Sequence, residues 1–271
     1  MKSVDIQRIQ IIELEALSSF LQFCTSNGIK VFLRGGSVLG AVKYKGFIPW
    51  DDDIDVAIPR ADYSKLINLM EKTRLSDKFD FYYWKFNSNV HSYFPRLALK
   101  EEERIRLNLP KNTEQGLHIM DIIPLDGSPN NGILRRLFYL YIYILRALAS
   151  TNTVYQGEHK NPHTKKQQSI INFLRLLGIH KIFEQKSIYQ KMDMLFSKYQ
   201  WNKSDYSGTV TASLGNKESL ESSIWGEGIA TQFSGVDVLI PVKYDIYLKK
   251  LYGSDYMAYT PKDSERKSHF V

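Results

Sequence analysis

The acidic run at residues 51–56 (DDDIDV) constrains this chain most, because four carboxylates fall within five positions and lead straight into an apolar segment. Like charges packed this closely repel one another unless cations or basic groups neutralise them. Side chains alternate between the two faces of a β-strand, so Asp53 and Asp55 are predicted on one face and the intervening aliphatic side chains on the other. The run therefore predicts a strand that buries its apolar face and presents carboxylates on the opposite one.

A second strand-like segment carries a lone carboxylate. Asp121 lies within the apolar run Leu117–Ile123, where an unpaired buried aspartate would be costly. Carboxylate oxygens are the ligands that Mg²⁺ and Mn²⁺ prefer, so we expect Asp53, Asp55 and Asp121 to share one metal site. The alternative is a solvated acidic loop, which is what most aspartate clusters are.

A glycine turn precedes the acidic run. The strand predicted at Ile29–Leu33 runs into Arg34, Gly35, Gly36 and Ser37, and Ser37 is predicted to cap the following helix. Backbone N–H groups at such a helix start can hold a phosphate. The turn lacks the Gly-Lys-Ser/Thr of a P-loop and the spacing of a dinucleotide-binding fingerprint. A double glycine alone is a weak signal, because tight turns use it often.

The order of predicted elements indicates an α+β fold. The first half is predicted to contain helices at 4–27, 37–45 and 62–72 and strands at 29–33, 53–58, 81–85, 93–97 and 117–123, the last closed by Pro124. The second half is predicted to contain helices at 133–149, 167–177, 188–199 and 243–252. We therefore predict a catalytic core over residues 1–130 and a mainly helical region over 131–271, within one continuous globular unit.

The charge balance and cysteine content restrict the partners and the compartment. With 36 Lys and Arg against 29 Asp and Glu, the net charge of +7 suits an anionic partner: a phosphorylated small molecule, an acidic membrane surface or a nucleic acid. The single cysteine, Cys24, excludes an internal disulfide and favours a reducing compartment. No secretory signal is predicted at the N-terminus, where charged residues interrupt the apolar pattern.

The most apolar stretch is too short to span a membrane. Leu137–Leu145 (LFYLYIYIL) is bounded by Arg135, Arg136 and Arg146, whereas a spanning helix needs about 20 apolar residues. We expect a buried core helix there. The alternative is a helix that rests on an anionic lipid surface.

Three stretches together resemble a known family. Residues 33–56 (LRGGSVLGAVKYKGFIPWDDDIDV), residues 118–127 (HIMDIIPLDG) and residues 241–253 (PVKYDIYLKKLYG) resemble the LicD family of phosphocholine transferases, which is related to the fukutin-like proteins. This family falls in the nucleotidyltransferase superfamily, with a polymerase-beta-like mixed sheet. Two departures are mild: the family often has Arg-His at Lys43-Tyr44 and Gly-Thr at Gly36-Ser37.

The resemblance implies Mg²⁺-dependent transfer of phosphocholine from CDP-choline to a sugar hydroxyl. The acceptor would be a bacterial surface glycan (teichoic acid, lipopolysaccharide or capsule) or its polyprenyl-linked precursor. Asp53, Asp55 and Asp121 would hold the metal and act in catalysis. Substrate binding would fall to the following residues: Arg34, Gly35, Gly36, Ser37, Lys43, Lys45 and Trp50. Trp50 is the preferred aromatic contact for choline, with Tyr82, Tyr83 and Trp84 as further aromatic candidates.

Two other functions stay open at this point. One is a nucleotidyltransferase that uses an NTP donor, and the other is a glycan- or nucleic-acid-binding protein that has lost the chemistry. The three candidate metal carboxylates argue against a pure binder, and no nucleic acid is expected. The expected location is the cytoplasm, with peripheral contact to the inner face of the plasma membrane as an additional expectation.

Overall fold

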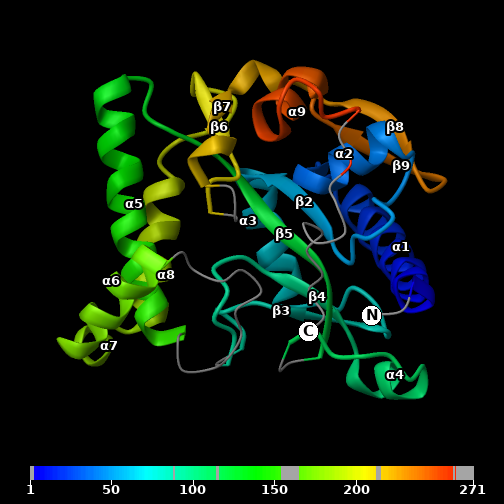
Figure 1. Cartoon of the computed structure of the whole chain (residues 1–271), viewed down its shortest axis with the longest axis horizontal. Helices are drawn as coiled ribbons and strands as arrows, with labels where there is room; N and C mark the ends of the chain where they lie inside the picture. The colour runs from blue at the N-terminus through cyan, green and yellow to red at the C-terminus, as the bar shows by residue number, and fades with distance from the viewer. Residues whose placement is uncertain are drawn as a thin grey trace.

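The computed structural model describes residues 3–87, 89–113, 116–153, 165–211, 215–258 and 260. A mixed sheet of nine strands forms its centre, with helices around it (Figure 1). The strands are β1 (Phe32–Leu33), β2 (Ile54–Pro59), β3 (Phe79–Tyr82), β4 (Arg96–Leu99), β5 (Leu117–Gly127), β6 (Tyr206–Gly208), β7 (Leu220–Glu221), β8 (Ile229–Phe233) and β9 (Val236–Ile240).

Helices flank the sheet and build a separate layer at one edge of the molecule. They are α1 (Ser3–Ser26), α2 (Gly35–Lys43), α3 (Arg60–Met70), α4 (Glu101–Arg106), α5 (Gly132–Thr153), α6 (Lys165–Leu176), α7 (Ile179–Ile182), α8 (Gln185–Phe196) and α9 (Tyr244–Tyr252). Two short 3₁₀ turns, η1 (Gly215–Glu218) and η2 (Ser222–Ile224), lie between β6 and β8. In Figure 1, α5 to α8 stand together on the side of the sheet opposite α1 and the β8–β9 hairpin. The predicted α+β class is confirmed.

The centre of the sheet is the parallel pair β2 and β5, in which Asp55 lies opposite Asp121. The order of strands is β3-β4-β5-β2-β1-β9-β8, and β6 extends the end of β5. Ile54, Val56 and Ile58 are fully buried, as the alternation predicted. Helix α1 contacts β5, and α3 contacts both central strands. The side chains of Ile54, Val56 and Ile58 therefore belong to the core, and Asp55 lies on the opposite face of the sheet beside Asp121.

Strand β5 does not end at Pro124, as the sequence had predicted, but continues to Gly127. The Ile122 N–H donates to Pro95 on the β4 side, so the nitrogen of Pro124, two residues later, points to that side too. Pairing with β4 has already ended there, with Arg96 opposite Asp121. The missing N–H of Pro124 therefore removes no hydrogen bond from the sheet.

The second half of the chain is mainly helical, as expected, but it also supplies strands that the sequence analysis did not predict. β8 and β9 form an antiparallel hairpin, and β9 pairs with β1 in parallel through Leu239 and Phe32. At the tip of the hairpin, Ser234 and Gly235 both have positive φ angles, of 51° and 86°. The sheet thus joins residues of both predicted regions.

Helix α5 contains the apolar stretch 137–145, and the expected core placement holds for one face only. Phe138, Ile142 and Leu145 are buried, whereas Leu137 and Leu140 are exposed. Hydropathy alone could not separate these faces, because both are apolar. No helix in the described part of the chain has the length and hydropathy needed to cross a membrane.

A buried ion-pair network joins the helical layer to the sheet. Arg60, at the start of α3, binds Asp126 of β5 through Nε and Nη2, at 2.6 Å each. Its Nη1 lies 2.7 Å from Oδ1 of Asp193 on α8. Both arginine contacts are charge-assisted, so they fix α8 against the end of β5.

Candidate active site

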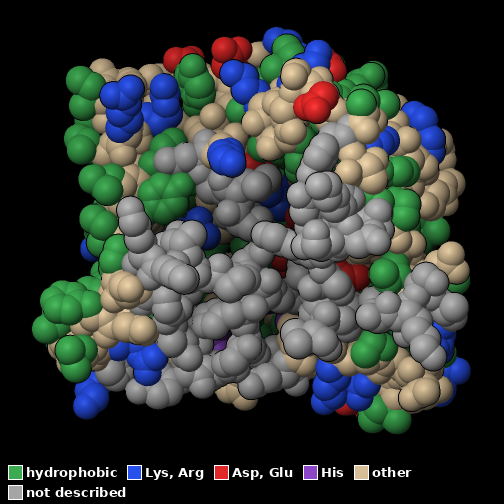
Figure 2. Space-filling view, viewed as in Figure 1, with side chains coloured by type: hydrophobic (Ala, Val, Ile, Leu, Met, Phe, Trp, Pro, Cys, Tyr) green, Lys and Arg blue, Asp and Glu red, His purple; other side chains and the backbone are tan. Residues whose placement is uncertain are grey.

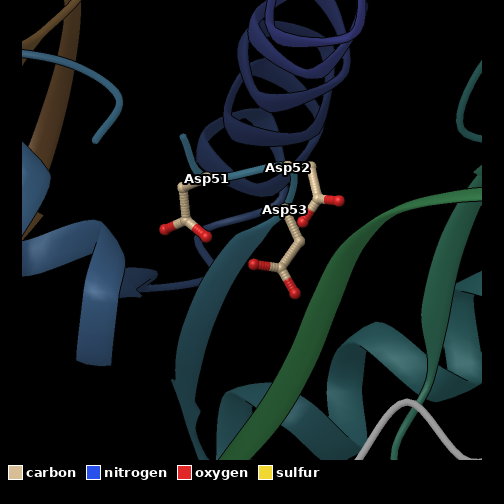
Figure 3. Close-up of side chains that lie close together, drawn as sticks. All are labelled: Asp51, Asp52 and Asp53. Carbon is tan, nitrogen blue, oxygen red and sulfur yellow. The ribbon is translucent and has the colours of Figure 1, made fainter. Parts of the chain in front are cut away.

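The acidic loop before β2 gathers three carboxylates. Ligand oxygens of Asp51, Asp52 and Asp53 all lie within 4.8 Å of one another. Asp52 is fully buried, whereas Asp51 and Asp53 are half-buried. Figure 3 shows the Asp53 carboxylate directed toward the space between β2 and β5, with Asp51 and Asp52 to either side of it. Three hard oxygen donors in this arrangement fit a divalent cation such as Mg²⁺.

Helix α1 holds this loop in place from outside the sheet. The side-chain amide of Gln10 donates to the carbonyls of Ile48 and Asp51, at 3.2 and 2.9 Å. The Asp51 N–H closes the turn by donating to the Ile48 carbonyl at 2.9 Å. These hydrogen bonds fix the loop backbone before any cation binds. Cation binding therefore costs less conformational entropy than it would in a mobile loop.

The two strand aspartates lie side by side, and each has an arginine partner. Nη1 of Arg34 is 2.7 Å from Oδ2 of Asp55, and Nε of Arg96 is 2.8 Å from Oδ1 of Asp121. Burial raises the pKa of the Asp55 carboxyl to about 7, although Arg34 opposes this shift. The charges of Asp53 and Asp121 add to the rise, which places all three carboxylates in one electrostatic neighbourhood.

These observations divide the predicted metal ligands. Asp53 belongs to the compact cluster of the loop, while Asp55 and Asp121 lie on the adjoining strands and are held by arginines. Asp51 and Asp52, which the sequence analysis did not select, complete the cluster. The assignment of Asp53, Asp55 and Asp121 as one ligand set stays a prediction.

Arg34 has a buried position that the sequence analysis did not foresee. Its side chain is 2% exposed, and Nη2 lies 2.6 Å from Oε1 of Glu218, which is fully buried. Its Nε donates to the Thr209 hydroxyl at 3.1 Å. A guanidinium enclosed by Asp55, Glu218 and Thr209 orients the Asp55 carboxylate. This geometry gives Arg34 a positioning role, and its expected substrate contact stays a prediction.

The glycine turn differs from the predicted capped helix start. Helix α2 begins at Gly35 with Arg34 at its N-cap, and no side chain caps it. The Ser37 hydroxyl instead accepts from the Asp55 N–H at 2.9 Å, so the predicted cap is wrong. The helix starts two residues earlier than predicted because Arg34 already supplies the first accepting carbonyl, to Ser37 N–H at 3.1 Å.

Two of the three amides of the turn are engaged inside the protein. The Gly35 N–H donates to the Tyr247 hydroxyl at 2.8 Å, and that of Ser37 donates to Arg34. Among the residues that the structure describes, the Gly36 N–H has no partner. The phosphate contact predicted for this turn stays a prediction, for which the Gly36 amide is the remaining donor of the three.

The turn packs directly against the carboxylates. Gly35 has a φ of +52°, which favours glycine, and a Cβ placed there would lie 3.6 Å from Oδ2 of Asp55. A Cβ on Gly36 would lie 3.2 Å from Oδ2 of Asp51. The motif residues that are about 15 to 20 positions apart in the sequence therefore form one surface, with Gly36 next to Asp51.

The remaining candidates lie at different places. Trp50 is half-buried and meets the Tyr44 ring edge-on, with centroids 6.2 Å apart. Lys43 ends α2 and lies over the same Tyr44 ring, and Lys45 is exposed. By contrast, Tyr83 and Trp84 are buried in the core, with 0% and 1% exposure, so they cannot form a choline cage.

Helix α9 and the segment before it supply contacts that the sequence analysis missed. The Tyr247 hydroxyl accepts from Gly35 and lies 3.4 Å from Oε1 of Glu218. Residues 241–253 were noticed for their resemblance alone, and nothing in their spacing assigns a role to one tyrosine. Glu218 carried no signal, since its partner Arg34 is 184 positions away.

The stretch of chain that carries this site is similar to known proteins. Residues 28–128 match the LicD/FKTN/FKRP nucleotidyltransferase domain, which includes the glycine turn, the acidic loop and β5. The chain is 26% identical over 273 residues to lipopolysaccharide cholinephosphotransferase LicD of Haemophilus influenzae, covering 99% of this chain and 97% of that protein.

Shorter similarities occur with two uncharacterized proteins. One, from Rickettsia typhi, is 35% identical over 68 residues, covering 23% of this chain and 22% of that protein. The other, from Rickettsia prowazekii, is 44% identical over 41 residues, covering 15% of each.

Proposed function

From the premise that residues 28–128 are a LicD/FKTN/FKRP nucleotidyltransferase domain, we propose that this protein is a cholinephosphotransferase. It would transfer phosphocholine from CDP-choline to a sugar hydroxyl of a bacterial surface glycan or of its polyprenyl-linked precursor. The name of the full-length Haemophilus influenzae relative supports this activity and favours lipopolysaccharide as the acceptor. The reaction would take place at the cytoplasmic face of the membrane.

The observation that carries the proposal is the contact of the glycine turn with the acidic loop. A Cβ placed on Gly36 would lie 3.2 Å from Oδ2 of Asp51, whose oxygens cluster with those of Asp52 and Asp53, and the Gly36 amide is the proposed anion donor. A diphosphate needs both amide donors and cation neutralisation, and this surface offers both. A binding protein for neutral glycans has no need for either.

Asp53 and Asp55, with Asp121 beside them in register, are the proposed ligands of Mg²⁺ or Mn²⁺. When bound, the ion neutralises the charge of the donor diphosphate and of the leaving CMP. Arg34 keeps Asp55 oriented, and Arg96 does the same for Asp121. Lys43 and Lys45 are proposed to attract the anionic donor, and Trp50 to contact the choline.

The transfer exchanges one P–O bond for another. The acceptor hydroxyl oxygen attacks the phosphorus that bears choline, and the bond from this phosphorus to the bridging oxygen of CMP breaks. The electron pair of that bond leaves with CMP. Asp121 is proposed to accept the proton of the hydroxyl. In-line positioning and charge neutralisation supply most of the rate enhancement in such reactions, with no covalent intermediate on the protein.

Calorimetry tests the donor. CDP-choline, CDP-ethanolamine, CDP-ribitol, CTP and ATP are titrated into the wild type and Asp53→Asn, with and without Mg²⁺. We expect Mg²⁺-dependent, selective binding of CDP-choline that weakens in the variant. Preference for CTP or ATP would assign the protein to NTP-dependent nucleotidyltransferases instead, and binding of no nucleotide would reject both activities.

Release of CMP from CDP-choline tests the carboxylates. Asp53→Asn, Asp55→Asn and Asp121→Asn are nearly isosteric and each is expected to lower the rate by about 100-fold or more. Asp77→Asn, at an exposed position away from these strands, is the matched control and keeps wild-type turnover. Unchanged turnover in any of the three would remove that residue from the site. Asp51→Asn and Asp52→Asn then show whether the loop cluster is the ligand set.

A further inference from the structure

The outer surface of the helical layer is apolar. Eight large aliphatic or aromatic side chains on α5, α6 and α7 are between 56% and 84% exposed: Ile133, Leu134, Leu137, Leu140, Ile170, Phe173, Leu176 and Ile182. We call this set the α5–α7 face. Folded monomers rarely leave large apolar side chains clustered at the surface without a use for them.

The α5–α7 face belongs to a helix whose other side is already packed. Ile133, Leu137 and Leu140 follow one another at spacings of four and three, so they form one stripe along α5. Phe138 and Ile142, on the buried side, face the core. Helix α5 contacts α6, α7 and α8. Figure 2 shows hydrophobic side chains along the edge of the molecule that α5 and α7 form, so the stripe continues onto neighbouring helices.

The charge of the same segment has one sign. Residues 128–183 contain eight Lys and Arg but only one acidic residue, Glu158, which gives +7. This equals the net charge of the whole chain, and the other residues hold 28 charges of each sign. Arg136 and Lys181 are exposed beside the α5–α7 face, and Figure 2 shows Lys and Arg side chains at the end of α5. Arg135 and Arg146 differ: the guanidinium of Arg135 stacks on Tyr206 at 3.8 Å from the ring centroid, and that of Arg146, which is half-buried, donates to the Val210 carbonyl at 3.1 Å.

We propose that the α5–α7 face docks onto the surface of an anionic lipid bilayer. Its apolar side chains enter the boundary between headgroups and acyl chains, and the exposed Arg136 and Lys181 meet the lipid phosphates. A helix that lies at the membrane–water interface needs an apolar stripe and basic residues beside it. Residues 128–183 have both features. A folded protein partner with mixed surface charge would not match a segment of one sign. The α5–α7 face contains no residue of the acidic site, so docking does not depend on the proposed activity.

Vesicle flotation of the full chain tests docking. The probes are vesicles of phosphatidylcholine with phosphatidylglycerol and vesicles of phosphatidylcholine alone, in buffer with EDTA and no nucleotide. The wild type is expected to float with the anionic vesicles, and the bound fraction should fall as salt rises, because basic side chains contribute to binding. Weak or no flotation is expected with phosphatidylcholine alone.

Variants separate the contribution of the apolar side chains to vesicle binding from that of the basic side chains. Leu137→Glu and Phe173→Glu place a charge on the apolar stripe, and each is expected to weaken partitioning onto anionic vesicles about tenfold or more. Arg136→Gln, which removes one charge, should weaken it less and flatten the salt dependence. Ile11→Glu on α1, where the isoleucine is 68% exposed, is the matched control and should bind as the wild type does. Circular dichroism confirms that each variant is folded.

Three results would overturn the proposal. In the first, anionic vesicles do not retain the wild type at low salt; in the second, the two glutamate variants bind as tightly as the wild type. In the third, light scattering shows a dimer that both glutamate variants dissociate, while vesicles bind none of the proteins. That result would assign the α5–α7 face to a second copy of this chain. CMP release, measured on the same preparations without lipid, reports separately on the proposed activity.

Discussion

At the scale of single residues, the candidate site depends on a buried ionic chain behind Asp55. Arg34 joins Asp55 to Glu218, and Tyr247 joins Glu218 to the amide of Gly35. A charge in this position cannot be solvated, so each member must be paired. The chain thus couples the orientation of a proposed metal ligand to residues of the second half of the sequence.

Glu218→Gln tests this coupling. The amide keeps the shape but loses the charge that pairs with Arg34, so we expect the free energy of unfolding to fall by about 1–3 kcal/mol. Urea denaturation measures the change. Glu221→Gln, an exposed position on β7, is the control and should stay within about 0.5 kcal/mol of the wild type. Equal effects of the two substitutions would show that the buried pair adds no stability.

Cys24 offers a second test at this scale. Burial, and to a smaller extent the charge of Asp62, raises the pKa of the thiol to about 12. A pKa above the ordinary value means that the folded state holds the proton more tightly, so the thiolate fraction at pH 8 is about a thousandfold lower than in the unfolded chain. A disulfide reagent should label Cys24 slowly in the native protein and rapidly in denaturant. Equal rates in both states would contradict the burial.

At the scale of elements, helix α2 and the acidic loop are held together by close backbone contact. A Cβ on Gly40 would lie 2.4 Å from the carbonyl oxygen of Gly46. Lys45, next to it, has a φ of 58°, and its carbonyl accepts from the Ser234 N–H at 2.7 Å. The β8–β9 hairpin therefore closes over the loop that leads to the carboxylates.

Gly40→Ala is expected to separate these elements. The methyl group forces the loop away, which should cost about 1–3 kcal/mol of stability in a thermal or urea unfolding experiment. It should also weaken binding of CDP-choline with Mg²⁺, because the loop leads to Asp51. Gly132→Ala is the matched control: no atom lies within 4 Å of the added methyl, and the change is expected to be neutral or slightly stabilising. A stable Gly40→Ala variant would show that the loop shifts freely.

At the scale of the whole molecule, Arg60 connects the sheet with the helical layer. It is the shared partner of Asp126 and Asp193, which lie on β5 and α8. Lys85 also reaches Asp193, at 2.8 Å. The proposed membrane face and the proposed metal site are therefore parts of one connected body.

Arg60→Lys keeps the charge but loses the planar fork that meets Asp126 at two atoms. We expect the free energy of unfolding to fall by about 2 kcal/mol or more, and hydrogen exchange in α8 to rise more than in β2. Arg106→Lys, in the exposed pair with Glu103 on α4, serves as the control and should change stability by less than about 0.5 kcal/mol. Uniform exchange changes across α8 and β2 would show that Arg60 acts on global stability alone.

Much of the fold was predictable because the spacing of apolar residues along the chain indicates helices and strands. The alternation of residues 53–58 predicted which face of β2 is buried, and the apolar spacing of residues 4–27 predicted α1. The hairpin β8–β9 was missed because its strands are short and only half-buried. The end of β5 was predicted at Pro124, but the strand continues to Gly127. A proline interrupts a strand only where a neighbouring strand needs its N–H, and β4 no longer pairs with β5 at that point.

The sequence by itself predicted the α+β class, and residues 28–128 alone match the LicD/FKTN/FKRP nucleotidyltransferase domain, because both depend on local patterns of residues along the chain. The functional roles of Asp53, Asp55 and Asp121 stay predictions. Only the tertiary structure decided that Arg34 is buried against Glu218 and that Tyr247 binds the turn, across 184 and 212 positions. It also decided which face of α5 is exposed. Such contacts depend on how elements pack, and no local pattern encodes a partner so distant.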